Sequence, residues 1–173
     1  MLKVAPRIRT SYYEVHASNA EELYREIYLN HGPVGNGGER FAARTRWDIQ
    51  WRFKHEQQGN MCFMTDVTVA IGIVNTFPRW IDIGRASPEY AVRWQSFLGA
   101  LTTFQALHQM NGNMAADEIE AKLRPMPPSS DCVTLEANAN QIAQQVIAKF
   151  QERDIELNRS TRYGETLGAT FPH

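Results

Sequence analysis

The alternation of apolar and polar residues is strongest between residues 44 and 54. One face of this stretch carries Thr45, Trp47, Ile49, Trp51 and Phe53. The opposite face carries polar or charged side chains, which are Arg44, Arg46, Asp48, Gln50, Arg52 and Lys54. A period of two residues predicts a long strand with an aromatic inner face and a solvated outer face.

A second alternating stretch follows a turn at residues 57–60. It covers residues 61–75, and its apolar positions are Val67, Val69, Ile71 and Ile73. Two alternating stretches joined by so short a turn predict a β-hairpin. Upstream, residues 8–17 mix β-forming and polar residues and predict a further strand. Ser18 and Glu21 have the spacing of a capping box, which predicts a short helix ending near Leu29.

From Ser87 onward the spacing of apolar residues changes to three and four, which predicts a long helix as far as Leu123. Its stripe consists of Trp94, Phe97, Leu98, Leu101, Phe104, Leu107 and His108. Asp131 can cap a second long helix, whose stripe is Leu135, Ala139, Ile142, Val146 and Phe150. We therefore expect an α+β fold, with an antiparallel sheet of about three strands and a short helix packed by two long C-terminal helices. One domain should span residues 1–173, with an N-terminal extension over about 1–9 and coil over about 160–173.

Composition narrows the classes of partner. The chain has 173 residues, and its 18 Lys and Arg against 19 Asp and Glu give a net charge of −1, which offers no electrostatic ground for nucleic-acid binding. The apolar runs are far shorter than the roughly 20 residues of a membrane helix, so we expect no membrane span. Residues 1–6 lack the apolar core of a signal peptide, so we expect either a cytosolic chain or a mature form whose signal has been removed.

The residue types that carry chemistry are few. Cys62 and Cys132, 70 residues apart, are too few for a four-thiolate zinc site, and their spacing leaves both a disulfide and two buried thiols open. No nucleophile or phosphate-binding motif is present, and the glycines of residues 35–38 predict a mobile loop. Four of the five histidines fall on predicted surface, namely His16, His31, His55 and His173. His108 instead lies in the apolar stripe of the long helix, where it is either a hydrogen-bonded core residue or a ligand.

Several short motifs follow one another along the chain. They are Asn30-x-Gly32-Pro33, Thr45-Arg46-Trp47-x-x-x-Trp51-Arg52-Phe53, Cys62, Phe77-Pro78-Arg79-Trp80, Trp94-x-x-Phe97-x-x-x-Leu101, Pro127-Pro128-x-x-x-Cys132 and Thr161-Arg162-x-Gly164-x-x-x-Gly168-Ala169. In this order and spacing, from about residue 10 to 172, the chain resembles a bacterial family of secreted zinc-dependent proteases that is otherwise a domain of unknown function. The resemblance implies a zincin-like domain.

In that family the long helix carries His-Glu-x-x-His, which holds a zinc ion through two histidines and places a glutamate as general base. The resemblance aligns this motif with residues 104–108, so that Phe104 takes the place of the first ligand and Gln105 that of the base. His108 keeps the place of the second ligand, and Tyr163 takes that of a third. Phenylalanine cannot bind a metal, and a glutamine amide is not basic near neutral pH. The motif is therefore degenerate, and we expect no catalytic residue and no cofactor.

The resemblance also implies export, and its cysteine pair implies a Cys62–Cys132 disulfide, a bond that persists in oxidising compartments. We therefore expect a pseudoenzyme that acts in binding or as an accessory subunit of a periplasmic or extracellular assembly, with a protein partner whose identity the sequence does not give. The polar face of residues 44–54 and the glycine loop are candidate contact surfaces.

Two alternatives stay open. The first is a divergent zinc metallopeptidase with a non-standard site that combines His108 with His31 or His16. A register shifted to residues 108–112 does not restore the motif, because it lacks a glutamate and a second histidine. The second alternative is a cytosolic scaffold with two free thiols.

Overall fold

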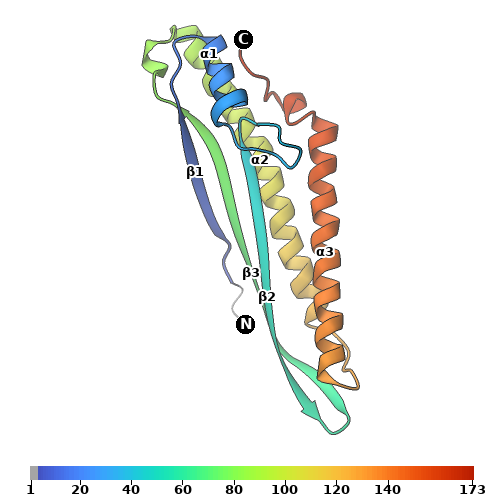
Figure 1. Ribbon diagram of the computed structural model, residues 1–173. Coiled ribbons are helices and arrows are strands. Elements are labelled where there is room, and N and C mark those ends of the chain that lie inside the picture. The colour runs from blue at the N-terminus through green and yellow to red at the C-terminus, as the bar shows by residue number, and fades with distance from the viewer. Residues whose placement is uncertain (1–3) are drawn as a thin grey trace. The chain divides into compact units, whose positions relative to one another are not determined.

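The computed structural model describes residues 4–173, and its elements follow the predicted order (Figure 1). Three strands, β1 (Arg7–Val15), β2 (Arg44–Gln58) and β3 (Met61–Trp80), form one sheet in the order β1-β3-β2. The helices are α1 (Ala20–Arg25), which continues as a π-helical segment (Glu26–His31), α2 (Pro88–Leu123) and α3 (Cys132–Thr161). Short 3-10 turns cover Ile83–Arg85 and Glu165–Leu167. The predicted α+β class, with a three-stranded sheet and two long C-terminal helices, is confirmed.

The chain forms two compact units. The first unit contains residues 4–7, Trp47–Ile73 and Met110–Ile155, and the second contains Ile8–Arg46, Val74–Gln109 and Glu156–His173. Each unit has its own hydrophobic core. No helix among residues 4–173 is both long enough and apolar enough to cross a lipid bilayer.

The core of the first unit lies between the β2–β3 hairpin and the helices α2 and α3. It contains Ile49, Val67, Val69, Ile71, Ile73, Ala115, Ala116, Ile119, Leu123, Ala139, Ala143, Val146 and Phe150. Small alanines on both helices allow close packing, while the indole of Trp47 donates to Asp154 Oδ2 at 2.8 Å and that of Trp51 donates to Asn140 Oδ1 at 2.8 Å. The hairpin turns at Gly59, whose φ of +60° suits a two-residue turn. The predicted inner face of β2 therefore packs as the alternation indicates.

The core of the second unit is aromatic. Trp80 and Trp94 meet edge to face with ring centroids 5.7 Å apart, and Phe97 meets Phe171 in the same way at 5.8 Å. In the segment predicted as coil, about residues 160–173, α3 ends at Thr161 and a 3-10 turn covers Glu165–Leu167, and within this segment Phe171 is buried in the core of the second unit, which the sequence pattern did not predict. A single apolar residue after two glycines has no periodicity, which is why the pattern gives no sign of it.

Other predicted details differ in the second unit. The sheet is not wholly antiparallel, because β1 and β3 run in the same direction (Figure 1). Two contacts along the strands agree with this direction. The Arg79 guanidinium lies over the Tyr12 ring at 4.6 Å, and further along both strands Ile81 N–H donates to Val15 C=O. The N-cap of α1 is Asn19 rather than Ser18, since the Asn19 side chain accepts from Glu22 N–H at 2.9 Å.

The N-terminal segment and the glycine loop contain more regular structure than the sequence pattern predicts. The predicted N-terminal extension 1–9 overlaps β1, which begins at Arg7, and its residues 1–3 lie outside the described part of the chain. The predicted mobile loop is a small bridged turn, in which Val34 pairs with Arg40 and Gly35 N–H donates to Glu39 C=O at 2.7 Å.

A charged contact links α2 to α3 in the first unit and makes its stability depend on pH. Lys149 Nζ lies 2.6 Å from one oxygen of Glu118, and Lys122 Nζ lies 3.1 Å from the other. The hydrogen bond from Lys149, followed by that from Lys122, holds the pKa of the Glu118 carboxyl below its ordinary value. A depressed carboxyl pKa adds stability above the pKa of the unfolded state, and this stability is lost as pH falls through the folded-state pKa.

Glu118→Gln should therefore lower the free energy of unfolding at pH 7 by about 0.2–1 kcal/mol, the range of exposed ion pairs. The variant should also lose less stability than the parent chain upon acidification. Denaturant titrations at pH 7 and in acid measure both effects, with the exposed Glu152→Gln on α3 as the matched control. Parallel acid profiles for parent and Glu118→Gln would contradict the assignment.

Candidate functional site

The residues aligned with the zinc motif lie on the buried face of α2 in the second unit. Phe104 is 3% exposed, Gln105 4% and His108 7%. Phe104 and His108 are one helical turn apart, and their rings meet edge to face with centroids 4.9 Å apart. The spacing that would bring two ligands to one metal therefore brings one aromatic ring and one imidazole together.

The imidazole of His108 has a polar partner within the same unit. Its Nε2 lies 2.9 Å from Asn158 Oδ1, near the end of α3. This hydrogen bond satisfies the imidazole as a core histidine requires, because a buried polar group without a partner is costly.

The turn after α3 brings the predicted third position to the same place. Arg162, Tyr163 and Gly164 have φ values of 50°, 56° and 89°, so the chain reverses sharply through the left-handed region. A Cβ on Gly164 would lie 2.8 Å from Cγ of Phe104, so this turn packs directly on the Phe104 ring. Tyr163 is half-exposed and stacks on Phe41 with ring centroids 4.9 Å apart. The segments that the resemblance aligns with a zinc site are therefore neighbours.

The donor set at this place does not fit zinc. Zinc takes nitrogen, sulfur or carboxylate ligands, and Phe104 has no donor atom. His108 is engaged by Asn158, and the phenol ring of Tyr163 is stacked on Phe41.

The two histidines considered for a non-standard site lie beside carboxylates in the second unit. His16 Nδ1 is 3.4 Å from Asp82, and His31 Nε2 is 3.1 Å from Glu26. Each imidazole thus has an acidic neighbour of its own.

The position of the general base holds a buried amide. Gln105 Nε2 donates to Ala43 C=O at 3.3 Å, and Gln105 Oε1 is buried without a hydrogen-bond partner among the described residues. A charged carboxylate at this place would face the Ala43 carbonyl oxygen with little solvent, whereas the neutral amide donates to it. The glutamine therefore suits its surroundings better than an ionised glutamate would.

Sequence reasoning missed a polar network next to this helix. Thr45 Oγ1 lies 2.7 Å from Asn75 Oδ1, and Asn75 Nδ2 donates to Gln109 Oε1 at 3.1 Å. Asn75 and Gln109 also line a cavity of about 370 Å³ in the second unit, together with Thr10, Tyr12, Phe77, Pro78, Leu98, Thr102 and Ala106. Asn75 interrupts the apolar alternation of β3, which is the one signal in the sequence that marks it.

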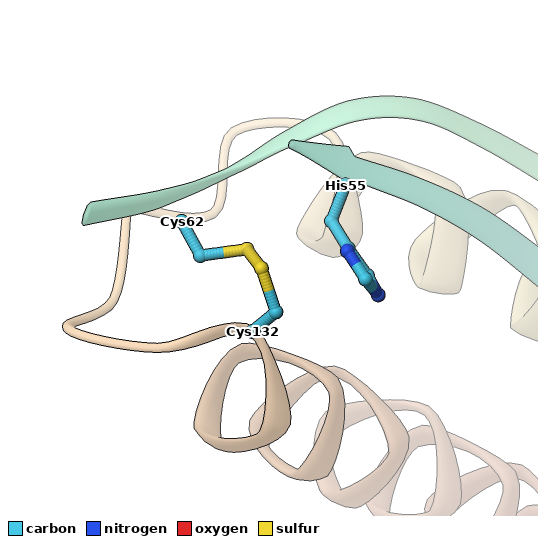
Figure 2. Close-up of side chains that lie close together, drawn as sticks. All are labelled: His55, Cys62 and Cys132. Atoms are coloured by element: carbon cyan, nitrogen blue, oxygen red, sulfur yellow. A yellow bond between two sulfur atoms is a disulfide. The ribbon is translucent and has the colours of Figure 1, made fainter. Parts of the chain in front are cut away.

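The first unit contains the predicted disulfide, which is confirmed. Cys62 of β3 and Cys132, the first residue of α3, are bonded, and their Cα atoms are 5.1 Å apart. Cys62 and Ser129 also exchange two backbone hydrogen bonds of 2.7 and 3.0 Å. Figure 2 shows the imidazole of His55, from β2, beside the two sulfur atoms. Sequence reasoning placed His55 on the surface and did not associate it with the cysteines.

Comparison with known proteins identifies the family. The chain belongs to the family described as "Bacterial protein of unknown function (DUF922)", which matches residues 10–164. No curated protein matches the chain, and no solved structure matches it. The bacterial family is therefore established at the level of a domain of unknown function, and zinc-dependent proteolysis is no part of its description.

Proposed function

We propose that this chain is a non-catalytic domain that keeps the frame of a zinc-protease site without its metal ligands, and that it acts in binding or as an accessory subunit of an exported assembly. One observation carries the proposal. Phe104, Gln105, His108 and the Tyr163–Gly164 turn are gathered in one place, but their side chains pack and hydrogen-bond with the protein itself. A site that has lost its metal is expected to fill the vacated volume with apolar side chains, because cavities are destabilising.

The competing proposal is a divergent zinc metallopeptidase that uses His108. It would require the imidazole to leave Asn158 and to recruit donors from elsewhere in the chain. One protein ligand is too few for a catalytic zinc site, which normally has three. The contacts of His108 therefore favour the non-catalytic domain.

Metal analysis of the purified protein distinguishes the two proposals. In non-reducing buffer, where the disulfide holds both cysteines, we expect far less than one zinc per chain and no peptide cleavage. Stoichiometric zinc that disappears in His108→Ala would contradict the non-catalytic domain and favour the metallopeptidase.

Restoring the missing groups tests the origin of the site. The triple variant Phe104→His, Gln105→Glu, Tyr163→His places two imidazoles one turn apart on α2, a carboxylate between them and a third imidazole on the neighbouring turn. We expect it to bind about one zinc per chain under non-reducing conditions, as measured by competition with a chromogenic chelator. The matched control is the triple variant Phe104→His, Gln105→Glu, Tyr12→His. It places the third histidine on β1 and leaves Tyr163 unchanged. Equal zinc binding by the two triple variants, or none by either, would contradict the proposal that the chain keeps the frame of a zinc-protease site.

We propose that the protein is exported, on the basis of its disulfide, because such bonds persist in oxidising compartments. The proposed partner is a protein, since β2 is an edge strand whose exposed side chains Asp48, Gln50, Arg52 and Lys54 offer a polar surface beside an unpaired backbone edge. Alkylation of intact cells before lysis, followed by denaturation and thiol counting, tests the redox state. Two reactive thiols would favour the cytosolic scaffold instead.

A further inference from the structure

The disulfide end of the first unit gathers more metal-binding side chains than the degenerate motif does. The donor atoms of His55, Cys62 and Cys132 all lie within 4.8 Å of one another (Figure 2). Glu136, one turn after Cys132 on α3, has its Oε2 3.8 Å from Nε2 of His55. His55, Cys62 and Cys132 come from β2, β3 and α3, so two strands and a helix bring the three donor atoms together, and Glu136 lies beside the imidazole.

While the sulfurs are bonded to each other they are poor metal ligands, but as thiolates they are among the strongest for zinc. We propose that reduction of the Cys62–Cys132 disulfide creates a tetrahedral site for Zn²⁺ or a similar thiophilic divalent cation, with Cys62, Cys132, His55 and Glu136 as ligands. A reducing dithiol supplies the two electrons and two protons that convert the disulfide to two thiols, and it is itself oxidised to a disulfide. Binding the cation then releases both thiol protons.

The frame of this site does not depend on the sulfur–sulfur bond. The backbone pairing of Cys62 with Ser129 anchors the segment before α3 to β3. Asp131 caps α3 by accepting from Thr134 N–H at 2.7 Å and from Thr134 Oγ1 at 2.9 Å, which fixes the start of the helix at Cys132. The Cα atoms of the two cysteines should therefore stay close after reduction.

The geometry suits a tetrahedral ion. Zinc–sulfur bonds of about 2.3 Å place two thiolates roughly 3.8 Å apart, a separation that side-chain rotation can supply while the backbone keeps its place. Solvent reaches the cluster at the imidazole and the carboxylate. Cys62 is fully buried, whereas the side chains of His55 and Glu136 are 34% and 55% exposed.

The site is independent of the proposed function, because it lies in the first unit and uses none of the residues aligned with the zinc motif. It would hold metal in a reducing environment, and oxidation would expel the ion as the disulfide forms. Hydrogen peroxide suffices chemically, since the two thiolates give up two electrons to form the bond, and the peroxide takes up these electrons and two protons from the solvent to become two waters.

Cobalt is the probe for the experiment, because tetrahedral thiolate-bound Co²⁺ absorbs strongly and distinctively. The full chain is titrated with Co²⁺ under argon, with and without a phosphine reductant. We expect one Co²⁺ per reduced chain with thiolate charge-transfer absorption, none for the oxidised chain, and loss of the signal on adding hydrogen peroxide. The Cys62→Ser/Cys132→Ser variant should show no charge-transfer band.

Further variants separate a built site from binding by two loose thiols. His55→Ala should weaken Co²⁺ binding at least tenfold, whereas His31→Ala, another partly exposed histidine beside a glutamate, should not. Glu136→Gln should weaken it as well, and Glu152→Gln on the same helix serves as its control.

Three results would overturn the proposal: equal affinity of His55→Ala and the parent chain, no tighter binding by the reduced chain than by the double-serine variant, or loss of the helical circular-dichroism signal on reduction. Unchanged binding by Glu136→Gln would overturn its place among the ligands.

Discussion

Removing the disulfide should lower the free energy of unfolding by about 4 kcal/mol, because the bond joins residues 70 positions apart and restricts the unfolded chain accordingly. The variant is Cys62→Ala/Cys132→Ala, measured by denaturant unfolding under non-reducing conditions. We expect a lower midpoint and a steeper dependence on denaturant, since the unfolded chain without a cross-link exposes more surface.

Two controls separate the cross-link from local effects. Cys62 is fully buried, so Cys62→Ser/Cys132→Ser adds a buried hydroxyl at one end and should cost somewhat more than the alanine pair. In the parent chain, adding the reductant should reproduce most of the loss caused by the alanine pair. A loss below about 1 kcal/mol in the alanine pair would show that the cross-link restricts the unfolded chain far less than the entropy model states.

The sequence pattern predicts an element best where its periodic alternation of apolar and polar residues continues over many residues. The alternation of residues 44–54 and the stripes of the two helices predicted β2, α2 and α3 closely, because each buries a repeating face. The direction of β1 could not be predicted in this way. Nothing local distinguishes a strand that pairs in parallel with β3 from one that pairs antiparallel. Phe171 was missed for a related reason, since a single buried residue has no period.

The two candidate sites also differ in how far their residues are close in sequence. Phe104, Gln105 and His108 are close in sequence, so one helix fixes their neighbourhood, and the resemblance supplied Tyr163. The partner of His108, Asn158, depends on how α3 packs and could not be predicted from spacing. The convergence of His55 with the cysteines needs the hairpin turn, the strand register and the start of α3 at once. No local pattern contains all three.

Phe104→Ala should lower the free energy of unfolding by about 3–5 kcal/mol, the usual cost of deleting a buried phenylalanine ring. The ring is 3% exposed, meets His108 edge to face, and supports the turn at Gly164. Its removal therefore leaves a cavity and loosens the turn after α3. Thermal or denaturant unfolding measures the loss, and Tyr163→Ala, which truncates a half-exposed ring beside the same turn, should cost well under half as much.

This comparison bears directly on how a metal site can be lost. A zinc ion holds its ligands together, so its removal leaves unpaired donors and a gap. A phenylalanine in place of one ligand fills the gap, and Asn158 satisfies the remaining imidazole. If Phe104→Ala costs as much as a core deletion, the aromatic ring has taken over the structural part of the metal's role. If it costs less than about 1 kcal/mol, the place is not packed, and the non-catalytic domain loses its main support.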